Sequence, residues 1–426
     1  MRYDRKKLQE FYSNLLTKDF MPFWKKACDC EYGGVYTCFS NDGSRLLSTD
    51  KYVWSQGRFL WMLARYIMLI DQGLAPDPDR EFYFTHAAKT YEFIRDNCIL
   101  PQDEGVCAYL TERDGTKKET IPGRGYYTSF FVDCFVIMGF AEYAKLTGKA
   151  EMFEQALALY DRTRAYLDRG EIVSEPYPQP KGFEVQANYM IMTNVTFVLH
   201  EAAQKLEHSR AGSLLEDAAQ NVRKILDCFY SPAHGLLREH IALDSADDDT
   251  LFARYIAPGH AVESMWFCRE VAIRAGMDEA YFDKIRAVIK NSINTGWDEK
   301  YGGLLRNTGY DGEKPQGRLL GDPQEDLVLE TWDSKLWWPH SECLYATLLC
   351  YEDTGDEQFL RQYEMMSDYA FRVYPNPDKE IGEWTQILDR KGRPMEKLVA
   401  LPVKDPYHIV RNFILIVELM AEKLSG

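Results

Sequence analysis

Helical periodicity runs through almost the whole chain, and the helical segments follow one another in pairs. Apolar residues recur every three or four positions in about twelve segments, a spacing typical of helices that bury one face. The expected helices span residues 5–27, 52–73, 81–97, 126–147, 149–170, 183–207, 210–229, 259–276, 278–294, 339–353, 356–373 and 405–424. Repeated helix pairs predict either an open solenoid or a closed ring.

Short stretches rich in glycine and aromatic residues interrupt these helices. They lie at residues 31–43, 106–115, 235–243, 297–312 and 382–392. The first two predict a short strand that is closed by an Asp-Gly turn, residues 235–243 are hairpin-like, and the last two repeat the first pattern. The repetition is clearest between Tyr32-Gly-Gly and Tyr301-Gly-Gly.

These insertions favour the closed ring, because the repeats of an open scaffold are usually more uniform. The fold class that we expect is therefore all-α. Six helical hairpins would form an (α/α)6 barrel, a toroid with short β-hairpin insertions. No Pro/Ser-rich linker and no shift in composition divides the sequence, so we expect one catalytic domain over residues 1–426.

Charge and cysteine content restrict the partners and the compartment. The formal net charge of −16 argues against nucleic acid and anionic membranes as main partners, since both need a basic surface. No run of eighteen apolar residues exists, and the first residues lead into an amphipathic helix and not a signal peptide. The ten cysteines are scattered without a CxxC pair. We expect reduced thiols in a cytoplasmic protein, with no disulfide framework or metal site.

A first candidate site lies where Pro258 and Gly259 break the chain and a helix begins. This helix carries His260 and Glu263 three residues apart, so that both side chains lie on one face. The positive end of the helix dipole disfavours a charged imidazole at His260. A neutral imidazole beside a carboxylate can act as a general base, but the same pair is compatible with a capping or buried structural histidine.

Three further stretches place polar residues near helix ends. Residues 51–58 end in Gly57-Arg58, and a cation among aromatic residues suits sugar hydroxyls or an oxyanion. In residues 335–343, the pair Trp337-Trp338 precedes Pro339, and Glu342 follows. Exposed rings at a helix start are a usual platform for sugars, although core packing is the better interpretation for one of the two tryptophans.

The last stretch, residues 403–411, contains His408 and, three residues on, Arg411. His408 could equally pack the seam of the barrel. If a ring brings His260 and His408 together, one can remove a proton from carbon and the other can return it on the opposite face. The other histidines lack such settings, and no metal-binding or phosphate-loop motif is present.

At these residues the chain resembles the N-acylglucosamine 2-epimerase (renin-binding protein) family. The resembling segments are Tyr52-Val-Trp-Ser-Gln-Gly-Arg58, Pro258-Gly-His-Ala-Val-Glu263 and Lys335-Leu-Trp-Trp-Pro-His-Ser-Glu342, in the family's order, within a resemblance from about residue 8 to 420. The resemblance implies an (α/α)6 barrel and epimerisation at sugar C2. It implies His260 and His408 as catalytic residues. It also implies a substrate pocket, for which the residues that we select are Arg58, Asn188, Glu263, Trp338, Glu342 and Arg411.

The family mechanism would begin with opening of the sugar ring, because the C1 aldehyde acidifies the C2 proton. His260 and His408 would then act on opposite faces of an enediolate, with Arg58 stabilising its charge. We expect Glu263 to hold His260 in the correct tautomer and Glu342 to bind hydroxyls or assist ring opening. This chemistry requires no metal or redox cofactor, while the family allows ATP as an activator and a homodimer.

The expected reaction is the interconversion of N-acylglucosamine and N-acylmannosamine. The segment before His408, with Tyr407, lacks the glycine-rich lead-in of the N-acyl enzymes and is closer to that of relatives that act on cellobiose. A cellobiose- or mannose-type 2-epimerase, or an aldose–ketose isomerase, therefore stays an alternative. A glycoside hydrolase would need two carboxylates across the pit, and a non-catalytic binding protein would not need the histidines.

Overall fold

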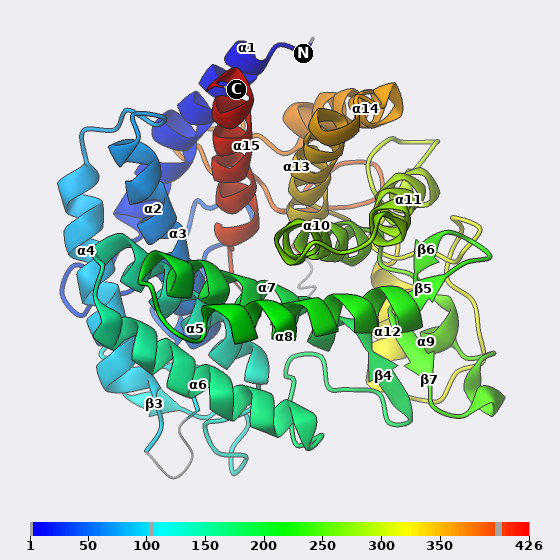
Figure 1. Ribbon diagram of the computed structural model, residues 1–426, viewed down its shortest axis with the longest axis horizontal. Coiled ribbons are helices and arrows are strands. Elements are labelled where there is room, and N and C mark those ends of the chain that lie inside the picture. Colours follow the sequence, from blue (N-terminus) through cyan, green and yellow to red (C-terminus); the bar gives the residue numbers. More distant parts are fainter. Residues whose placement is uncertain (1–2, 102–105, 397–402, 426) are drawn as a thin grey trace.

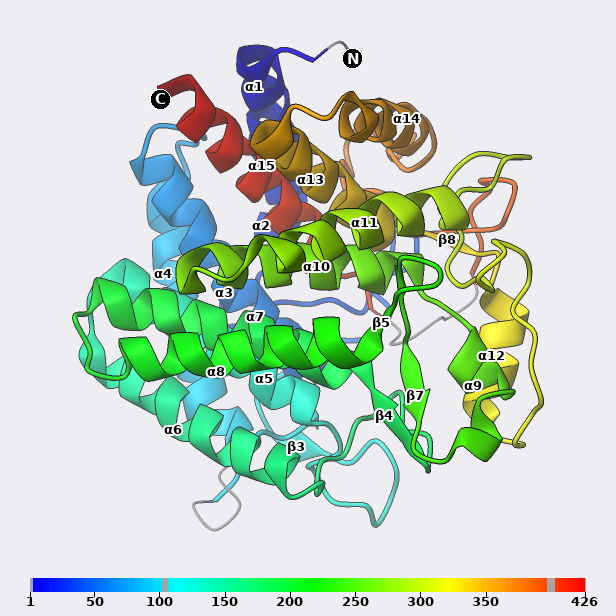
Figure 2. The ribbon, with the colours of Figure 1, turned by 45° about the vertical axis from the view of Figure 1, so that its right-hand side comes forward.

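Six helices form a closed ring in the computed structural model, which describes residues 3–101, 106–396 and 403–425. Each of these inner helices contacts the next along the chain, and the last contacts the first (Figures 1 and 2). They are α3 (Val53–Asp71), α5 (Phe130–Thr147), α7 (Gln186–Lys205), α10 (Pro258–Ala275), α13 (Trp337–Thr354) and α15 (Tyr407–Ser425).

An outer helix packs on each inner helix and completes a hairpin with it. The outer helices are α4 (Arg80–Phe93), α6 (Ala150–Asp168), α8 (Ala211–Lys224), α11 (Glu279–Gly296), α14 (Glu357–Val373) and α1 (Arg5–Leu15). The first five follow their partners directly, whereas α1 packs on α15, the last helix. The chain therefore forms the predicted (α/α)6 barrel, which is closed by contact between its two ends. The expectation of one domain stays a prediction.

Inner and outer helices differ in how much of their surface is apolar. The inner helix α5 is buried on nearly every face, whereas its outer partner α6 buries one side. The helices α3 and α5 approach each other closely at Gly57. A Cβ atom there would lie 2.5 Å from the backbone carbon of Phe135, so only glycine fits directly before Arg58.

The strands are short and mostly join segments that are distant in the sequence. β1 (Lys51–Tyr52), β2 (Leu110–Thr111) and β3 (Lys117–Lys118) form one antiparallel sheet. The remaining antiparallel pairs are β4 (Phe183–Val185) with β7 (His240–Ala242), β5 (Tyr230–Ser231) with β6 (Leu236–Leu237), and β8 (Lys335–Leu336) with β9 (Ile387–Leu388). Of these pairs, β2–β3 and β5–β6 are local hairpins.

Three details differ from the sequence-based expectation. Residues 31–43 contain no strand, because their two tight glycine turns leave only isolated bridges such as that between Cys28 and Val35. Residues 183–185, expected at the start of a helix, pair as β4 with β7. Two short helices, α9 (Leu251–Arg254) and α12 (Pro323–Thr331), were not expected from periodicity.

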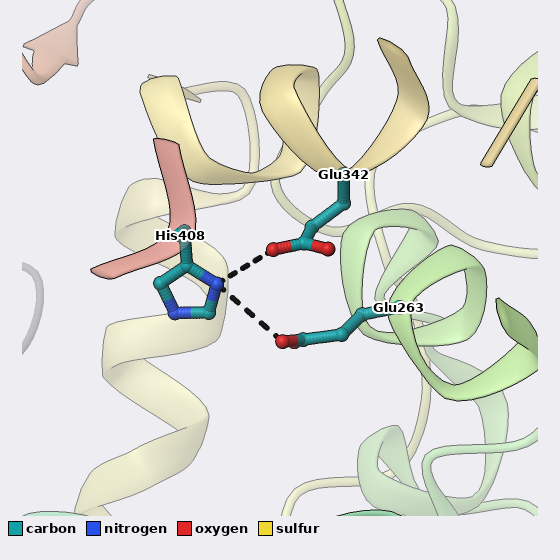
Figure 3. A group of neighbouring side chains, drawn as sticks. All are labelled: Glu263, Glu342 and His408. Atoms are coloured by element: carbon teal, nitrogen blue, oxygen red, sulfur yellow. Dashed lines mark hydrogen bonds and ion pairs between the residues drawn. The ribbon is translucent and has the colours of Figure 1, made fainter. Parts of the chain in front are cut away.

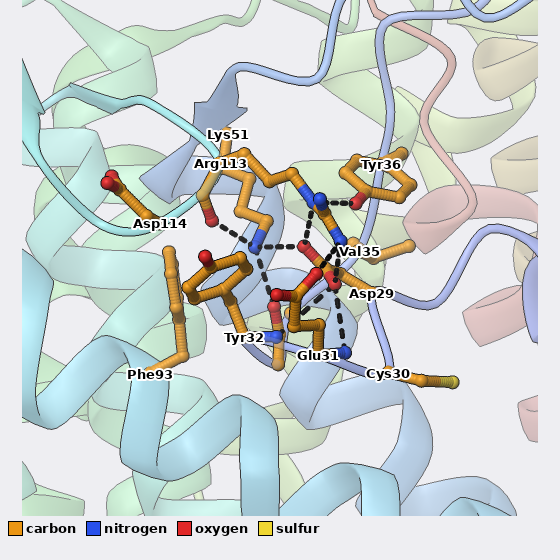
Figure 4. Close-up of polar contacts among 12 residues, drawn as sticks. Asp29, Cys30, Glu31, Tyr32, Val35, Tyr36, Lys51, Phe93, Arg113 and Asp114 are labelled. Atoms are coloured by element: carbon orange, nitrogen blue, oxygen red, sulfur yellow. Dashed lines mark hydrogen bonds and ion pairs between the residues drawn. The ribbon is translucent and has the colours of Figure 1, made fainter.

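Two similar buried clusters anchor the starts of α3 and α13. In the first, Lys51 Nζ donates to Asp29 Oδ2 (3.0 Å) and to the carbonyls of Gly33 (2.8 Å) and Arg113 (2.7 Å) (Figure 4). Asp29 also accepts from the guanidinium of Arg113. Lys51 is fully buried, and α3 begins two residues later at Val53.

The second cluster repeats this arrangement around Lys335. Its Nζ donates to Asp298 Oδ2 (3.1 Å) and to the carbonyls of Gly302 and Arg390, and Arg390 also binds Asp298. The repeated Tyr-Gly-Gly sequence thus supplies a carbonyl, from Gly33 or Gly302, to a buried lysine. Both lysines precede an inner helix that carries predicted site residues.

All six inner helices begin at the same end of the barrel. Their first turns line one cavity, while residues of five of them, all except α5, line a second cavity. The positive ends of six helix dipoles therefore point toward the first cavity. No helix among the described residues is both long and apolar enough to cross a bilayer.

Candidate active site

A cavity of about 280 Å³ opens among the first turns of the inner helices. Of the predicted site residues, seven line it: Arg58, Asn188, His260, Glu263, Trp338, His408 and Arg411. The eighth, Glu342, lies directly behind the wall and is fully buried. Segments far apart in the sequence therefore converge, as the ring requires, on one site.

His408 stands at the second position of α15, with one ring nitrogen held by carboxylates. Its Nδ1 lies 2.7 Å from Glu342 Oε1 and 3.4 Å from Glu263 Oε1 (Figure 3). Because Nδ1–H donates to Glu342, Nε2 carries the lone pair of the neutral ring. Burial lowers the pKa of His408, but Glu263 and Glu342 outweigh it and leave the pKa above its ordinary value.

Arg411 joins the two carboxylates around His408. Its Nη2 lies 2.6 Å from Oε1 of Glu263 and 2.6 Å from Oε1 of Glu342. Burial raises the pKa of Glu263, but His408 and Arg411 lower it more, so Glu263 stays ionised. The indole of Trp266 donates to the second oxygen of Glu342 at 2.8 Å.

These contacts change the roles expected for both glutamates. Glu263 lies on the same helical turn as His260 but turns toward His408 and Arg411, because the guanidinium attracts it across the barrel. Glu342 was expected to bind sugar hydroxyls or to assist ring opening. It is enclosed by Arg411, Trp266 and His408 instead, so it can orient His408 but does not line the cavity.

His260 has a different carboxylate partner, Glu239. His260 Nδ1 lies 2.8 Å from Glu239 Oε1, and Glu239 is buried in the turn between β6 and β7. Burial lowers the pKa of His260, but Glu239 outweighs it and leaves the pKa above its ordinary value. His260 and His408 therefore each pair Nδ1 with a carboxylate. Glu239 is not among the site residues expected from the sequence.

Trp338 lies between the two histidines. Its ring centroid is 5.2 Å from that of His260 and 5.2 Å from that of His408. Trp337 packs in the hydrophobic core, as expected for one member of the pair, and also borders the cavity. The helix begins at Trp337 rather than at Pro339, which places Glu342 in its second turn.

Arg58 is held on the cavity wall by one ion pair and three rings. Nη1 binds Asp405 Oδ2, and the guanidinium carbon lies 3.9 Å from the ring centroid of Phe135, with Trp54 and Tyr407 nearby. Nη2 lies 3.4 Å from Nε2 of His408. Asp405 is thus a positioning residue, although it was not among the site residues expected from the sequence. Its signal was an acid three residues before His408.

Asn188 contributes an amide to the cavity from the first turn of α7. Its side chain is buried, and its carbonyl oxygen has no hydrogen-bond partner among the described residues. Buried polar atoms are seldom left unpaired, so this oxygen is suited to accept a hydrogen bond from a ligand.

Glu263, Glu342 and His408 are also close enough to share a metal ion, with ligand atoms within 4.8 Å of one another. The space between the two carboxylates, however, is already bridged by the guanidinium of Arg411. Nδ1 of His408 donates a proton to Glu342 and so has no free lone pair. The cluster is therefore an ion-pair network with its own cation, which does not fit a metal centre.

A family model and individual relatives both match this chain over most of its length. The family model described as N-acylglucosamine 2-epimerase (GlcNAc 2-epimerase) matches residues 34–412, a range that contains every predicted site residue. The chain is 28% identical to N-acylglucosamine 2-epimerase of Bos taurus, over 95% of this chain and 89% of that protein. It is 23% identical to cellobiose 2-epimerase of Eubacterium cellulosolvens, over 92% and 94% of the two chains.

A solved structure of cellobiose 2-epimerase from Bacillus thermoamylovorans B4167 superposes with a TM-score of 0.75. The match has 18% sequence identity and covers 97% of this chain and all (100%) of that one. This likeness is one of fold.

Proposed function

Because the chain belongs to the N-acylglucosamine 2-epimerase family, we propose that it interconverts N-acylglucosamine and N-acylmannosamine at C2 of the open-chain sugar. The observation that carries this proposal is the presence of two histidines on one cavity, each with Nδ1 on a buried carboxylate. Each neutral ring then presents Nε2 to the substrate as a base.

The reaction needs a base on one face of C2 and an acid on the other. Once the ring has opened, the C1 aldehyde acidifies the C2 proton. One histidine removes it to give an enediolate, and the other, protonated, returns a proton to the opposite face. We assign these faces to His260 and His408, which flank Trp338.

The negative charge of the enediolate needs stabilisation at O1 or O2. Arg58 offers a guanidinium beside His408, and the dipoles of the inner helices point their positive ends into the cavity. Glu342 and Arg411 act through His408, because they hold its ring and balance its charge. Trp338 supplies an apolar face on which the C–H groups of a sugar can pack.

The size and lining of the cavity favour a monosaccharide. The cavity volume of about 280 Å³ is slightly below the usual range for small-molecule sites, about 300–1,000 Å³. The unpaired carbonyl of Asn188 suits a donor on the substrate, such as the N–H of an acylamino group. Both observations support an N-acyl hexosamine over cellobiose.

The test is incubation with N-acetylglucosamine, N-acetylmannosamine, mannose, glucose and cellobiose in D2O, followed by proton NMR. We expect deuterium at C2 and the epimer to appear together from the two N-acetyl sugars. His260→Ala and His408→Ala should each lower the rate by about 10²–10⁴-fold. Wild-type rates in both variants would refute the assignment of the bases. Formation of a 2-ketose would indicate an isomerase instead.

The remaining expectations are part of the same proposal. An enediolate pathway involves no net electron transfer, so we propose that neither a metal nor a redox cofactor is required, with ATP as an activator to be tested by addition. We also propose a homodimer, to be tested by light scattering, and no nucleic-acid partner. A cytoplasmic location is supported by ten free cysteines.

A further inference from the structure

We infer that Glu239 is the positioning residue for His260 and controls proton transfer on one face of the sugar only. This inference rests on the proposed function. Glu239 holds His260 and Glu342 holds His408, so the histidine on each face of the sugar has its own carboxylate partner.

The position of Glu239 is fixed by the strands around it. β6 ends at Leu237 and β7 begins at His240, and the carbonyl of Glu239 accepts the backbone N–H of Gln186 at 3.0 Å. This bond ties the turn to the start of α7, an inner helix. The side chain of Glu239 is 8% exposed, while that of His260 is 35% exposed. A buried, anchored carboxylate thus holds a histidine that is open to the cavity.

The support of His260 is simpler than that of His408. Glu342 accepts from His408, Arg411 and Trp266, so its charge is shared among several donors. For the side chain of Glu239, the hydrogen bond to His260 is the one found among the described residues. Other titratable groups also act on this pair. Glu263, on the same helix, raises the pKa of His260, and Arg306 lowers it. His240, beside Glu239, has a pKa lowered by burial to about 4, so it is neutral at neutral pH and adds no charge there.

The Nδ1–Glu239 bond therefore selects the tautomer in which Nε2 has the lone pair. Glu239→Gln keeps the size of the side chain but removes its charge, and its amide can donate to Nδ1 and so favour the wrong tautomer. Proton transfer by His260 should become slow, while the network around His408 is unchanged.

The two epimers make this difference measurable. One epimer presents its C2 proton to His260, and the other presents it to His408. In D2O, the second epimer can lose its proton to His408 and regain deuterium from the same residue, without inversion. Glu239→Gln should therefore slow epimerisation in both directions and C2 exchange of one epimer. C2 exchange of the other epimer should stay near the wild-type rate.

The experiment measures C2 exchange and epimerisation from each pure N-acetyl epimer for wild type, Glu239→Gln and Glu184→Gln. Glu184 lies on β4, beside the same strand pair, and binds Lys224 away from the cavity, so it is the matched control. We expect a loss of about 10–100-fold in the His260-dependent rates, the range found when the supporting group of a metal-bound histidine is removed. Equal slowing of both exchange reactions, or wild-type rates in both, would overturn the inference.

A second measurement does not depend on activity. In ¹⁵N-histidine NMR, His260 of the wild type should carry its proton on Nδ1 and titrate above its ordinary pKa of 6.5. In Glu239→Gln its pKa should fall while that of His408 stays unchanged. An unchanged His260 titration would overturn the inference. If the wild type exchanged no sugar proton, the proposed function would fail while this titration still decided the role of Glu239.

Discussion

Arg411 and His408 share one carboxylate oxygen. Nη2 of Arg411 lies 2.6 Å from Oε1 of Glu342, and Nδ1 of His408 lies 2.7 Å from the same atom. Glu342 thus receives a fixed cation and a titrating group together. The fixed cation limits how strongly the carboxylate can hold a proton on His408, as the base of the proposed mechanism would require.

Removal of this cation should destabilise the barrel. Arg411→Met leaves Glu263 and Glu342 buried and close together without a guanidinium, and breaking a buried pair typically costs about 3–5 kcal/mol. Urea unfolding followed by circular dichroism measures the loss. Arg223→Met is the control, because the ion pair of Arg223 with Glu216 is exposed, and it should change stability by less than about 0.5 kcal/mol. Equal stability of the two variants would contradict a stabilising role of the Arg411 ion pairs.

The activity should depend on pH as a bell-shaped curve. In either direction one histidine must be neutral and the other protonated. Below both pKa values no base remains, and above both no acid remains. Because the carboxylates raise the pKa of both His260 and His408, the maximum of kcat/KM should lie above pH 6.5. Steady-state rates between pH 5 and 10, in about half-unit steps, check this, and a maximum below pH 6 would be inconsistent with it.

Asp405→Asn should impair catalysis more than binding. The ion pair with Asp405 fixes one end of the Arg58 guanidinium, while the amide of the variant would retain an oxygen for the backbone N–H of Tyr407. A freely turning Arg58 stabilises the enediolate less well, so we expect kcat to fall about 10-fold with a smaller change in KM. Asp244→Asn, in an exposed turn, is the control for the same chemical change. A rise in KM alone would show that Asp405 supports binding instead.

Each of the two buried lysine clusters should contribute to the free energy of unfolding. Lys51→Met and Lys335→Met each leave an aspartate with arginine as its remaining ion-pair partner and remove the lysine donor of two carbonyls. We expect each to cost about 3 kcal/mol in the free energy of unfolding. Lys118→Met removes an exposed pair with Asp50 and should cost less than about 1 kcal/mol. Losses no larger than that of the control would show that the clusters are not anchors.

Sequence periodicity predicted the paired helices, while the glycine and aromatic insertions and the family resemblance favoured the closed ring over an open solenoid. The site was also largely predictable, since Arg58, His260 and His408 each lie in a recognisable segment at a helix start. The carboxylates that pair with the two histidines could not be predicted in the same way. The spacing of His260 and Glu263 indicated that these two side chains pair on one helix. Glu263 pairs instead with Arg411 of α15, because an ion pair across the ring is stronger than the contact with a neutral histidine on the same helix.

Glu239 was missed for a related reason. It precedes His240 in a short turn with no distinctive motif, and it reaches His260 because β7 pairs with β4, more than fifty residues earlier in the chain. Such a contact depends on strand register between distant segments, which periodicity does not determine. The same holds for β8 and β9, which join the start of α13 to residues 387–388.

The closure of the ring by α15 has a consequence for assembly. α15 carries His408 and Arg411 and packs against both α1 and α3, although it follows all the other inner helices in the chain. During synthesis from the N-terminus, the earlier hairpins can stack on one another, but the carboxylates of Glu263 and Glu342 have no cation until α15 docks. The partly formed barrel would thus hold two carboxylates without a cation. Docking of α15 would both close the ring and complete the ion-pair network around His408.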